Sequence, residues 1–324
     1  MKRTEQARNK TQNRHGIWKW FLVFTLYFTL YTLHCLYGKG LGTTGAQFLK
    51  VGMGARPLAM AGAFSAVADD VNSIYYSPAS LTRTNNKEIS ATYLKYFSDV
   101  NAGFVGYTGA CCKECYVGVG VTYLQVTDIE RRDLDEVKLG DFGATDIALF
   151  LDCAKKDVAN SLLENLAVGG GLKLISQKID DEKAFTVALD LSAYYPADDK
   201  LSFAFNIQNI SYGVKFIDEI DPLPLNIKVG AAYRVIKDLT VACDLDEYII
   251  DNKLYASVGA EYWIKNALAL RSGYRFGYDT SSLGGIAGLG VGAGVKIWSV
   301  TLDYAFVPFG DLGDTHRVSF GAKF

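Results

Sequence analysis

Catalytic chemistry needs a nucleophile, a base or metal ligands at close spacing, and this chain offers few such groups. Its 324 residues include three histidines. His15 and His34 lie in an apolar and basic N-terminal stretch, and His316 lies near the start of a predicted strand. No G-x-S-x-G, H-E-x-x-H or phosphate-binding glycine loop occurs. We therefore predict no catalytic residues, no metal site and no cofactor, and a protein that is not an enzyme.

The six cysteines could form disulfides or bind a metal. Cys111, Cys112 and Cys115 stand close together, but no second Cys-x-x-Cys pair or nearby histidine accompanies them, so a zinc site is not predicted. Cys115 and Cys153 fall at adjacent ends of the third and fourth predicted strands, where a cross-strand disulfide is one option. Pairing of Cys115 with Cys111 or Cys112 is a second option, and free thiols are a third. Cys243 is expected to face lipid.

Arg56, Asp69 and Asp70 are charged residues in a stretch, from Gly42 to Leu81, that is rich in Gly and Ala. Arg56, Asp69 and Asp70 are predicted to form ion pairs with charged side chains on the strands that follow. The alternative is a solvated polar interior. Truncating one member of a buried pair is expected to cost roughly 3–5 kcal/mol. The candidate partners are Lys173, Asp190, Lys228, Arg234, Asp244, Glu261, Arg271, Arg275, Lys296, Asp303 and Arg317.

The elements that must position these groups are β-strands. From Ile89 to Phe324, apolar and polar residues alternate with a period of two. In the last run, Val318 and Phe320 share one face while Arg317 and Ser319 share the other. About fourteen such runs, each of the ~10 residues that a tilted transmembrane strand needs, follow one another. Their expected centres are Thr92, Phe104, Val121, Ile147, Leu172, Leu189, Phe205, Val229, Val241, Val258, Leu270, Val291, Leu302 and Phe320.

The alternation predicts an all-β fold, a transmembrane antiparallel β-barrel with lipid outside and a polar lumen inside. A soluble β-sandwich or soluble barrel also alternates, with the apolar face inward. The long, evenly spaced strands and the aromatic terminal residue Phe324 favour the membrane. The loops expected at the outer end, residues 127–141, 211–223, 277–285 and 308–314, are short.

The N-terminus has the composition of an export signal. Basic residues between Lys2 and Lys19 precede an uncharged apolar run from Trp20 to Leu33. We interpret residues 1–40 as a signal peptide, with an uncleaved membrane anchor as the alternative. The predicted destination is the bacterial outer membrane. The formal net charge of −2 does not indicate a nucleic-acid partner.

One predicted strand carries glycine at every second position. Gly288, Gly290, Gly292 and Gly294 would leave its inner face without side chains. Such a face accommodates either a bulky neighbour or a passage. The small-residue stretch that precedes the barrel is the expected neighbour.

This stretch also carries a recognisable pattern. The run G-A-R-x-x-x-M-x-G-A-F-x-A-V-A-D-D begins at Gly54, and Y-x-x-P-A-x-L follows from Tyr75. Together with Gln208-Asn209-Ile210 and Leu302-Asp303-Tyr304-Ala305-Phe306, the pattern resembles the FadL-like outer-membrane barrels, and within them the PorV/PorQ-type branch. The resemblance covers most of residues 41–324.

The resemblance implies a fourteen-stranded barrel, residues 87–324, plugged by an N-terminal hatch, residues 41–86. It implies a monomeric channel in outer-membrane lipid that takes up hydrophobic small molecules such as long-chain fatty acids. Ser77, Pro78 and Ala79 stand where the family carries Asn-Pro-Ala in the hatch. A terminal aromatic residue such as Phe324 resembles the signal that the barrel-assembly machinery recognises. The PorV-type branch implies an alternative, a partner subunit of a protein secretion system without a transport role.

Overall fold

The computed structural model describes residues 40, 42–84, 86–96, 100–158 and 165–324. The predicted signal peptide, residues 1–40, lies outside the described residues except for Gly40. In the described ranges, no helix is both long enough and apolar enough to cross a membrane.

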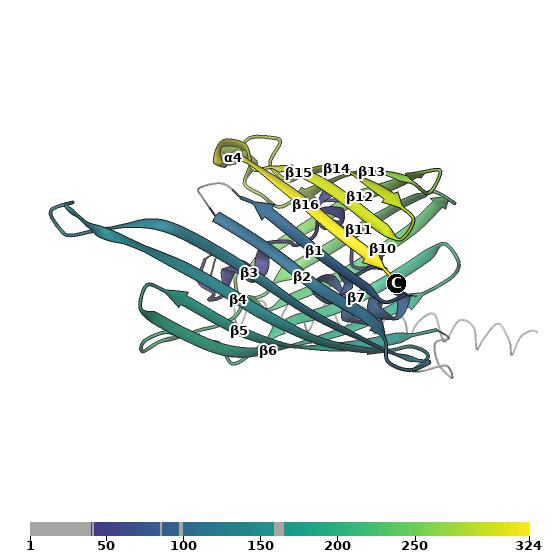
Figure 1. Ribbon diagram of the computed structural model, residues 1–324, viewed down its shortest axis with the longest axis horizontal. Helices are drawn as coiled ribbons and strands as arrows, with labels where there is room; N and C mark the ends of the chain where they lie inside the picture. Colours follow the sequence, from purple (N-terminus) through teal and green to yellow (C-terminus); the bar gives the residue numbers. More distant parts are fainter. Residues whose placement is uncertain (1–39, 41, 85, 97–99, 159–164) are drawn as a thin grey trace, which may run out of the picture.

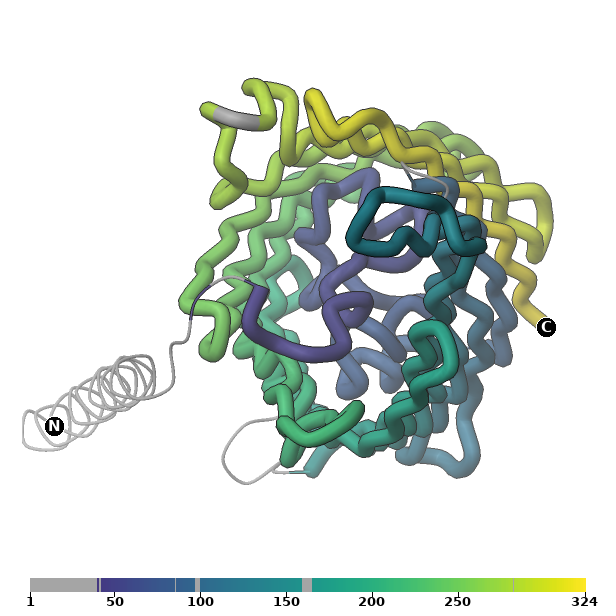
Figure 2. Tube along the Cα trace, turned by 90° about the vertical axis from the view of Figure 1, so that its left-hand side faces the viewer, coloured from purple at the N-terminus to yellow at the C-terminus, as the bar shows by residue number. Residues whose placement is uncertain are grey.

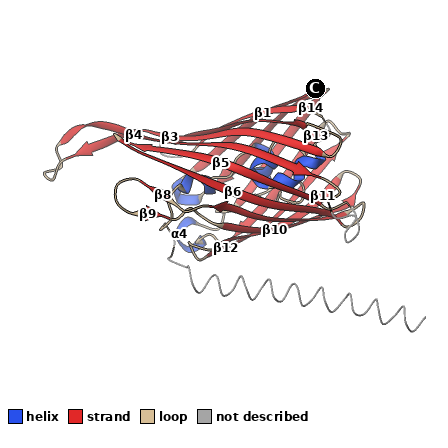
Figure 3. Cartoon of the chain, turned by 90° about the horizontal axis from the view of Figure 1, so that it is seen from below, coloured by secondary structure: helices blue, strands red, loops and turns tan. Residues whose placement is uncertain are grey.

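Fourteen antiparallel strands close into a barrel (Figures 1 and 3). Neighbours around the barrel are neighbours along the chain, and the last strand, β16, closes the barrel against β1. The barrel strands are β1 (Glu88–Lys95), β2 (Val100–Ala110), β3 (Cys115–Arg132), β4 (Lys138–Lys155), β5 (Ala167–Ile179), β6 (Glu182–Pro196), β7 (Leu201–Ile210), β10 (Asn226–Ile236), β11 (Leu239–Tyr248), β12 (Lys253–Ile264), β13 (Leu268–Phe276), β14 (Leu289–Ile297), β15 (Val300–Pro308) and β16 (Asp314–Lys323). The predicted all-β antiparallel barrel is confirmed, and every expected strand centre lies in one of these strands.

Alternating side chains give the barrel two different faces. In β16, Val318 and Phe320 are 43% and 51% exposed on the outer face, whereas Arg317 and Ser319 are buried in the lumen. The same alternation runs through β1 without interruption. Cys243 is exposed on the outside, as predicted. The outer face is therefore apolar and the lumen polar, the reverse of a soluble sandwich.

The longest hairpin corrects one prediction. Most of the expected loop at residues 127–141 is strand, because β3 and β4 stay paired up to Arg132 and Lys138 despite two register shifts. The alternation of apolar and polar residues weakens there, but cross-strand pairing still satisfies the backbone. The hairpin projects beyond the barrel at the end opposite the C-terminus (Figure 1). Its tip exposes Leu134 fully, together with Val137 and Leu139.

We call this the loop end of the barrel and the opposite end, where Phe324 lies, the turn end. Three other connections at the loop end carry short elements. These are β8 (Val214–Lys215) with β9 (Ile220–Asp221), α4 (Thr280–Leu283) and η3 (Gly310–Leu312).

The stretch before the barrel, residues 42–84, folds inside the lumen (Figure 2). We call it the N-terminal segment. It contains η1 (Gln47–Lys50), α2 (Ala55–Ala59), α3 (Ser73–Tyr76) and η2 (Pro78–Arg83). Gly54 and Gly62 take left-handed backbone angles on either side of α2, with φ of +83° and +85°, and so keep this helix short. Phe64 and Ile74 are completely buried between the segment and the wall.

Candidate functional site

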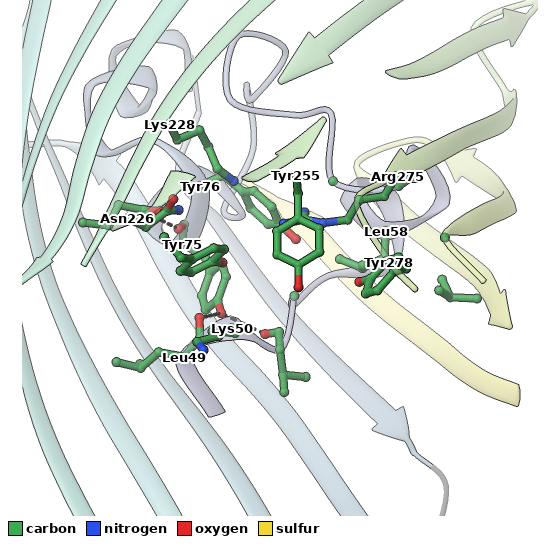
Figure 4. Close-up of a pocket in the computed structure, with 18 of the residues that line it drawn as sticks. Leu49, Lys50, Leu58, Tyr75, Tyr76, Asn226, Lys228, Tyr255, Arg275 and Tyr278 are labelled. Carbon is green, nitrogen blue, oxygen red and sulfur yellow. Dashed lines mark hydrogen bonds between the residues drawn. The ribbon is translucent and has the colours of Figure 1, made fainter. Parts of the chain in front are cut away.

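A cavity of about 250 Å³ lies in the lumen on the loop side of the N-terminal segment. We call it the aromatic cavity. The segment supplies Lys50 from η1 and Tyr75 and Tyr76 from α3 (Figure 4). The barrel wall supplies amides, cations and further rings, namely Lys173, Gln208, Asn209, Asn226, Lys228, Tyr248, Tyr255, Arg275 and Arg317, together with Tyr96, Tyr278 and Phe309 at the rim.

Five of the rings that line this cavity form a continuous series, which we call the aromatic arc. Tyr248 contacts Tyr255, with ring centroids 6.0 Å apart, and Tyr255 contacts Tyr278 at 5.3 Å. Phe309 then bridges Tyr278 at 5.9 Å and Tyr96 at 5.6 Å. These separations fall in the range in which aromatic pairs attract one another. The arc therefore presents ring faces and edges to the cavity from β11, from β12, from the residue after β1 and from the connections that follow β13 and β15.

Cationic side chains surround the same cavity, and most have a carboxylate partner. Lys50 binds Asp251 at 2.6 Å and Lys173 binds Asp190 at 2.8 Å. Lys228 and Arg275 share one carboxylate, Asp246, at 2.7 and 3.3 Å. Figure 4 shows Lys228 directed toward Tyr76 and Arg275 beside Tyr255; the Arg275 guanidinium lies 4.5 Å from the Tyr255 ring centroid.

A second cavity, of about 320 Å³, lies on the turn side of the N-terminal segment. We call it the charged cavity. Arg56 is its central group, because its Nε and Nη2 atoms each donate to Glu261 on β12 at 2.8 Å. Its Nη1 atom donates to Asp69 at 2.6 Å and to Asp70 at 2.8 Å. The predicted ion pair between the segment and the wall is thus present in the structure, with Glu261 as the partner.

The Arg56 network continues into the wall and affects Asp69. Arg271 donates to Glu261 at 2.6 Å and to Asp303 at 2.7 Å. Partial burial raises the pKa of Asp69, but the nearby Arg56 and Arg83 guanidinium groups hold that pKa well below its ordinary value. Asp69 is therefore ionised at neutral pH and available to pair with Arg56.

The N-terminal segment separates the two cavities. Leu58 and Tyr76 line the aromatic cavity, whereas Arg56 and Asp70 line the charged one. Hydrogen bonds fix the segment to the wall at several points. The amide of Ala55 donates to Ser319 Oγ at 2.8 Å, and the hydroxyl of Ser65 donates to Asp244 at 2.6 Å.

Known proteins share this architecture. No family model and no curated protein matches the sequence. Solved structures do match. The Ralstonia pickettii toluene transporter TbuX is 12% identical and has a TM-score of 0.60, over 84% of this chain and 98% of its own. A Pseudomonas aeruginosa FadL homologue is 11% identical, with a TM-score of 0.58 over 84% of this chain and 98% of its own. The Pseudomonas putida toluene transporter TodX is 12% identical, with a TM-score of 0.57 over 89% of this chain and 97% of its own. At these identities the likeness concerns the fold: this chain shares its barrel fold with these proteins.

The Ser77-Pro78-Ala79 motif lies against the wall and does not line the aromatic cavity. Ser77 and Ala79 are completely buried. The Ala79 amide donates to Ser192 Oγ on β6 at 3.0 Å, and the Ser77 hydroxyl lies 3.1 Å from the same atom. The motif therefore positions the segment in this structure.

The alternating glycines of the β14 region have three different surroundings. A Cβ atom on Gly290 would lie 2.3 Å from the Leu58 carbonyl oxygen, and one on Gly292 would lie 2.6 Å from the Ala59 Cβ, so α2 packs against both. Gly294 lies under the ion pair between Arg271 and Asp303, and Gly288 borders the aromatic cavity. Gly259 and Gly273 also lie close to the segment, because a Cβ atom on either would lie 2.6 Å from the Met60 carbonyl oxygen. Sequence reasoning missed them because each is the single glycine of its strand.

Of the three options for Cys115, the structure has the free thiol, and no disulfide joins it to Cys153. Cys115 stands opposite Lys155 and Cys153 opposite Val117, so the two cysteines are offset by two positions, and the described cysteines are all free. Hairpin register decides this offset, and the sequence spacing did not reveal it. Among the described residues, no group of three or more His, Cys, Asp and Glu side chains could hold a metal ion.

Sequence reasoning also missed the rings of the aromatic cavity. Tyr75, Tyr248, Tyr255 and Tyr278 belong to no common motif, and each is separated from its cavity neighbours by a turn or a strand. Only closure of the barrel brings them together. The signal available in the sequence was the count of 20 tyrosines, which does not indicate their positions.

Proposed function

We propose that this chain is a channel of the bacterial outer membrane that takes up hydrophobic small molecules, such as long-chain fatty acids, and that the N-terminal segment is its gate. The observation that carries the proposal is the aromatic cavity inside the barrel, whose floor is the N-terminal segment. Ligand sites are concave and lined by aromatic side chains with a few placed polar groups. The segment blocks the lumen beyond this cavity, so uptake requires it to move.

The outer surface supports the membrane location. Apolar side chains such as Leu189 (50% exposed) and Phe185 (63% exposed) point away from the lumen along the strands. An apolar band around a polar lumen fits a lipid environment. The proteins with the same fold support the function, since two of them are described as toluene transporters and one as a FadL homologue.

A reversible lock on the segment tests the gate. The Ala55 amide lies 2.8 Å from Ser319 Oγ, so a cysteine pair at these two positions would tie α2 to β16. The native cysteines are replaced by serine in this variant. We expect oleate uptake by proteoliposomes to stop when the pair is oxidised and to return on reduction. The cysteine-free parent should take up oleate under both conditions. Equal uptake by the oxidised and reduced variant would contradict gating by this segment.

The projecting hairpin favours a second candidate, the partner subunit of a secretion system. Leu134, Val137 and Leu139 are exposed at its tip, beyond the barrel. A cluster of exposed apolar side chains is typical of a surface that contacts a protein or a membrane. We would expect a photo-crosslinking residue at position 134 to capture one defined envelope protein in cells, while oleate uptake would be absent.

A further inference from the structure

Arg317 is a buried cation without an acidic partner. Its side chain lies on β16, is 1% exposed and lines the aromatic cavity. Its Nη1 atom donates to Thr315 Oγ1 at 2.6 Å, and its Nε atom has no partner. In the described ranges, no carboxylate forms an ion pair with it, although buried charges in proteins are normally paired. The cavity therefore contains an unused donor group with a full positive charge.

Arg317 is also the exception among the cations that line the cavity. Five cationic side chains line it, and three carboxylates pair with them, because Asp246 serves both Lys228 and Arg275. The Nε atom of Arg275 is also buried without a partner. A buried guanidinium that no carboxylate neutralises attracts an anion, because little water screens it.

The aromatic arc adds a preference for a ring. β16 places Arg317 opposite Leu94 near the end of β1, and Tyr96, the residue after that strand, also lines the cavity. Tyr96 is one end of the arc, which continues through Phe309 and Tyr278. An aromatic ring bound here could pack edge-to-face on these rings while a substituent reached Arg317.

The size of the cavity limits the ligand. Its volume of about 250 Å³ lies below the roughly 300–1,000 Å³ typical of pockets for larger ligands. Lysine, arginine and amide groups occupy much of the lining, which disfavours an extended alkyl chain.

We propose that the aromatic cavity binds a monocyclic aromatic carboxylate, with the carboxylate on Arg317 and the ring on the aromatic arc. The inference rests on the proposed function. Among the hydrophobic small molecules that function covers, it assigns this cavity to an aromatic acid and not to a long-chain fatty acid. A planar guanidinium and a carboxylate form paired, charge-assisted hydrogen bonds, which suits Arg better than Lys at this position.

Calorimetric titration of the purified full chain in detergent tests the ligand class, with benzoate as the compound. Toluene supplies a similar ring without charge, and laurate supplies the same charge on a long chain. We expect saturable binding of benzoate and at least tenfold weaker binding of toluene and laurate. Tighter binding of laurate or toluene would overturn the proposal.

Variants of Arg317 test the assigned role. Arg317→Met should weaken benzoate binding roughly 10- to 100-fold, the value of a lost hydrogen bond to a charged group. Arg317→Lys should bind with intermediate affinity. Arg131→Met, which removes one arginine from the projecting hairpin, should bind as the parent does. If Arg317 had only a structural role, Arg317→Met would lower the melting temperature of the ligand-free protein. If Arg317 is an unpaired buried charge, the variant should melt at the parental temperature or above it. Unchanged benzoate affinity in Arg317→Met would overturn the proposal.

Oleate uptake, measured on the same preparations in proteoliposomes, separates the two proposals. Uptake without benzoate binding would overturn the ligand assignment and leave the channel in place. If benzoate binds but neither benzoate nor oleate is taken up, the result would support the binding site and contradict transport.

Discussion

Arg56 ties the N-terminal segment to the barrel wall, so its removal should loosen the segment. It makes a bidentate contact with Glu261 on the wall and holds Asp69 and Asp70 within the segment. Replacement by Gln keeps most of the side-chain volume but removes the charge. Asp70 then loses its ion-pair partner, and the wall loses its charged contact with α2.

The magnitude follows from the surroundings of each partner. Breaking a buried pair costs roughly 3–5 kcal/mol. Glu261 keeps Arg271 at 2.6 Å, and the Asp69 side chain is 41% exposed, so water screens part of its loss. We therefore expect about 3 kcal/mol, the lower limit of that range. If the full 3 kcal/mol is lost from the free energy of opening the segment, the population of molecules with an open segment rises roughly 150-fold, since each 1.4 kcal/mol is a factor of ten.

Hydrogen exchange measured by mass spectrometry can detect this change. Amides between Ala55 and Asp70 should exchange about 100-fold faster or more in Arg56→Gln, while amides of the barrel strands keep the parental rates. Arg56→Lys should recover part of the protection. Arg131→Gln, at the projecting hairpin, should match the parent. Exchange in the segment within twofold of the parent would refute the view that this network holds it in place.

Two other substitutions test the packing and the membrane placement. Gly290→Val should destabilise the barrel by about 1–3 kcal/mol through overpacking, because a Cβ would lie 2.3 Å from the Leu58 carbonyl oxygen. Gly285→Val, where the space is open, should leave the melting temperature in detergent unchanged, and equal melting temperatures for both variants would contradict the contact. Leu189→Lys on the outer face should cost about 2–4 kcal/mol in a lipid bilayer if its strand crosses near the midplane. Leu134→Lys at the hairpin tip should cost nothing measurable in urea titrations of the protein in vesicles, and a similar lack of effect at Leu189 would argue against a lipid-facing surface.

Local pattern was sufficient to predict the barrel. In β16 and β1 the alternation of apolar and polar residues places each side chain on one of two faces, whatever the rest of the chain does. The strand centres follow from this period. The outward direction of the apolar face, and with it the lipid-facing position of Cys243, was expected from the long, evenly spaced strands and the terminal Phe324. The extension of β3 and β4 did not follow, because there the pairing of two strands, and not the pattern of either one, determines where the strand ends.

The sequence by itself thus determined the class of fold, the two faces of its wall and the presence of a small-residue segment with Arg56, Asp69 and Asp70. Only the tertiary structure decided which charges meet. Arg56 and Glu261 are 205 positions apart, and the closed register of fourteen strands brings them together. The same closure leaves Arg317 without a carboxylate and assembles the aromatic arc. A side chain's direction depends on local geometry, whereas its neighbours in the lumen depend on strand order, register and curvature together.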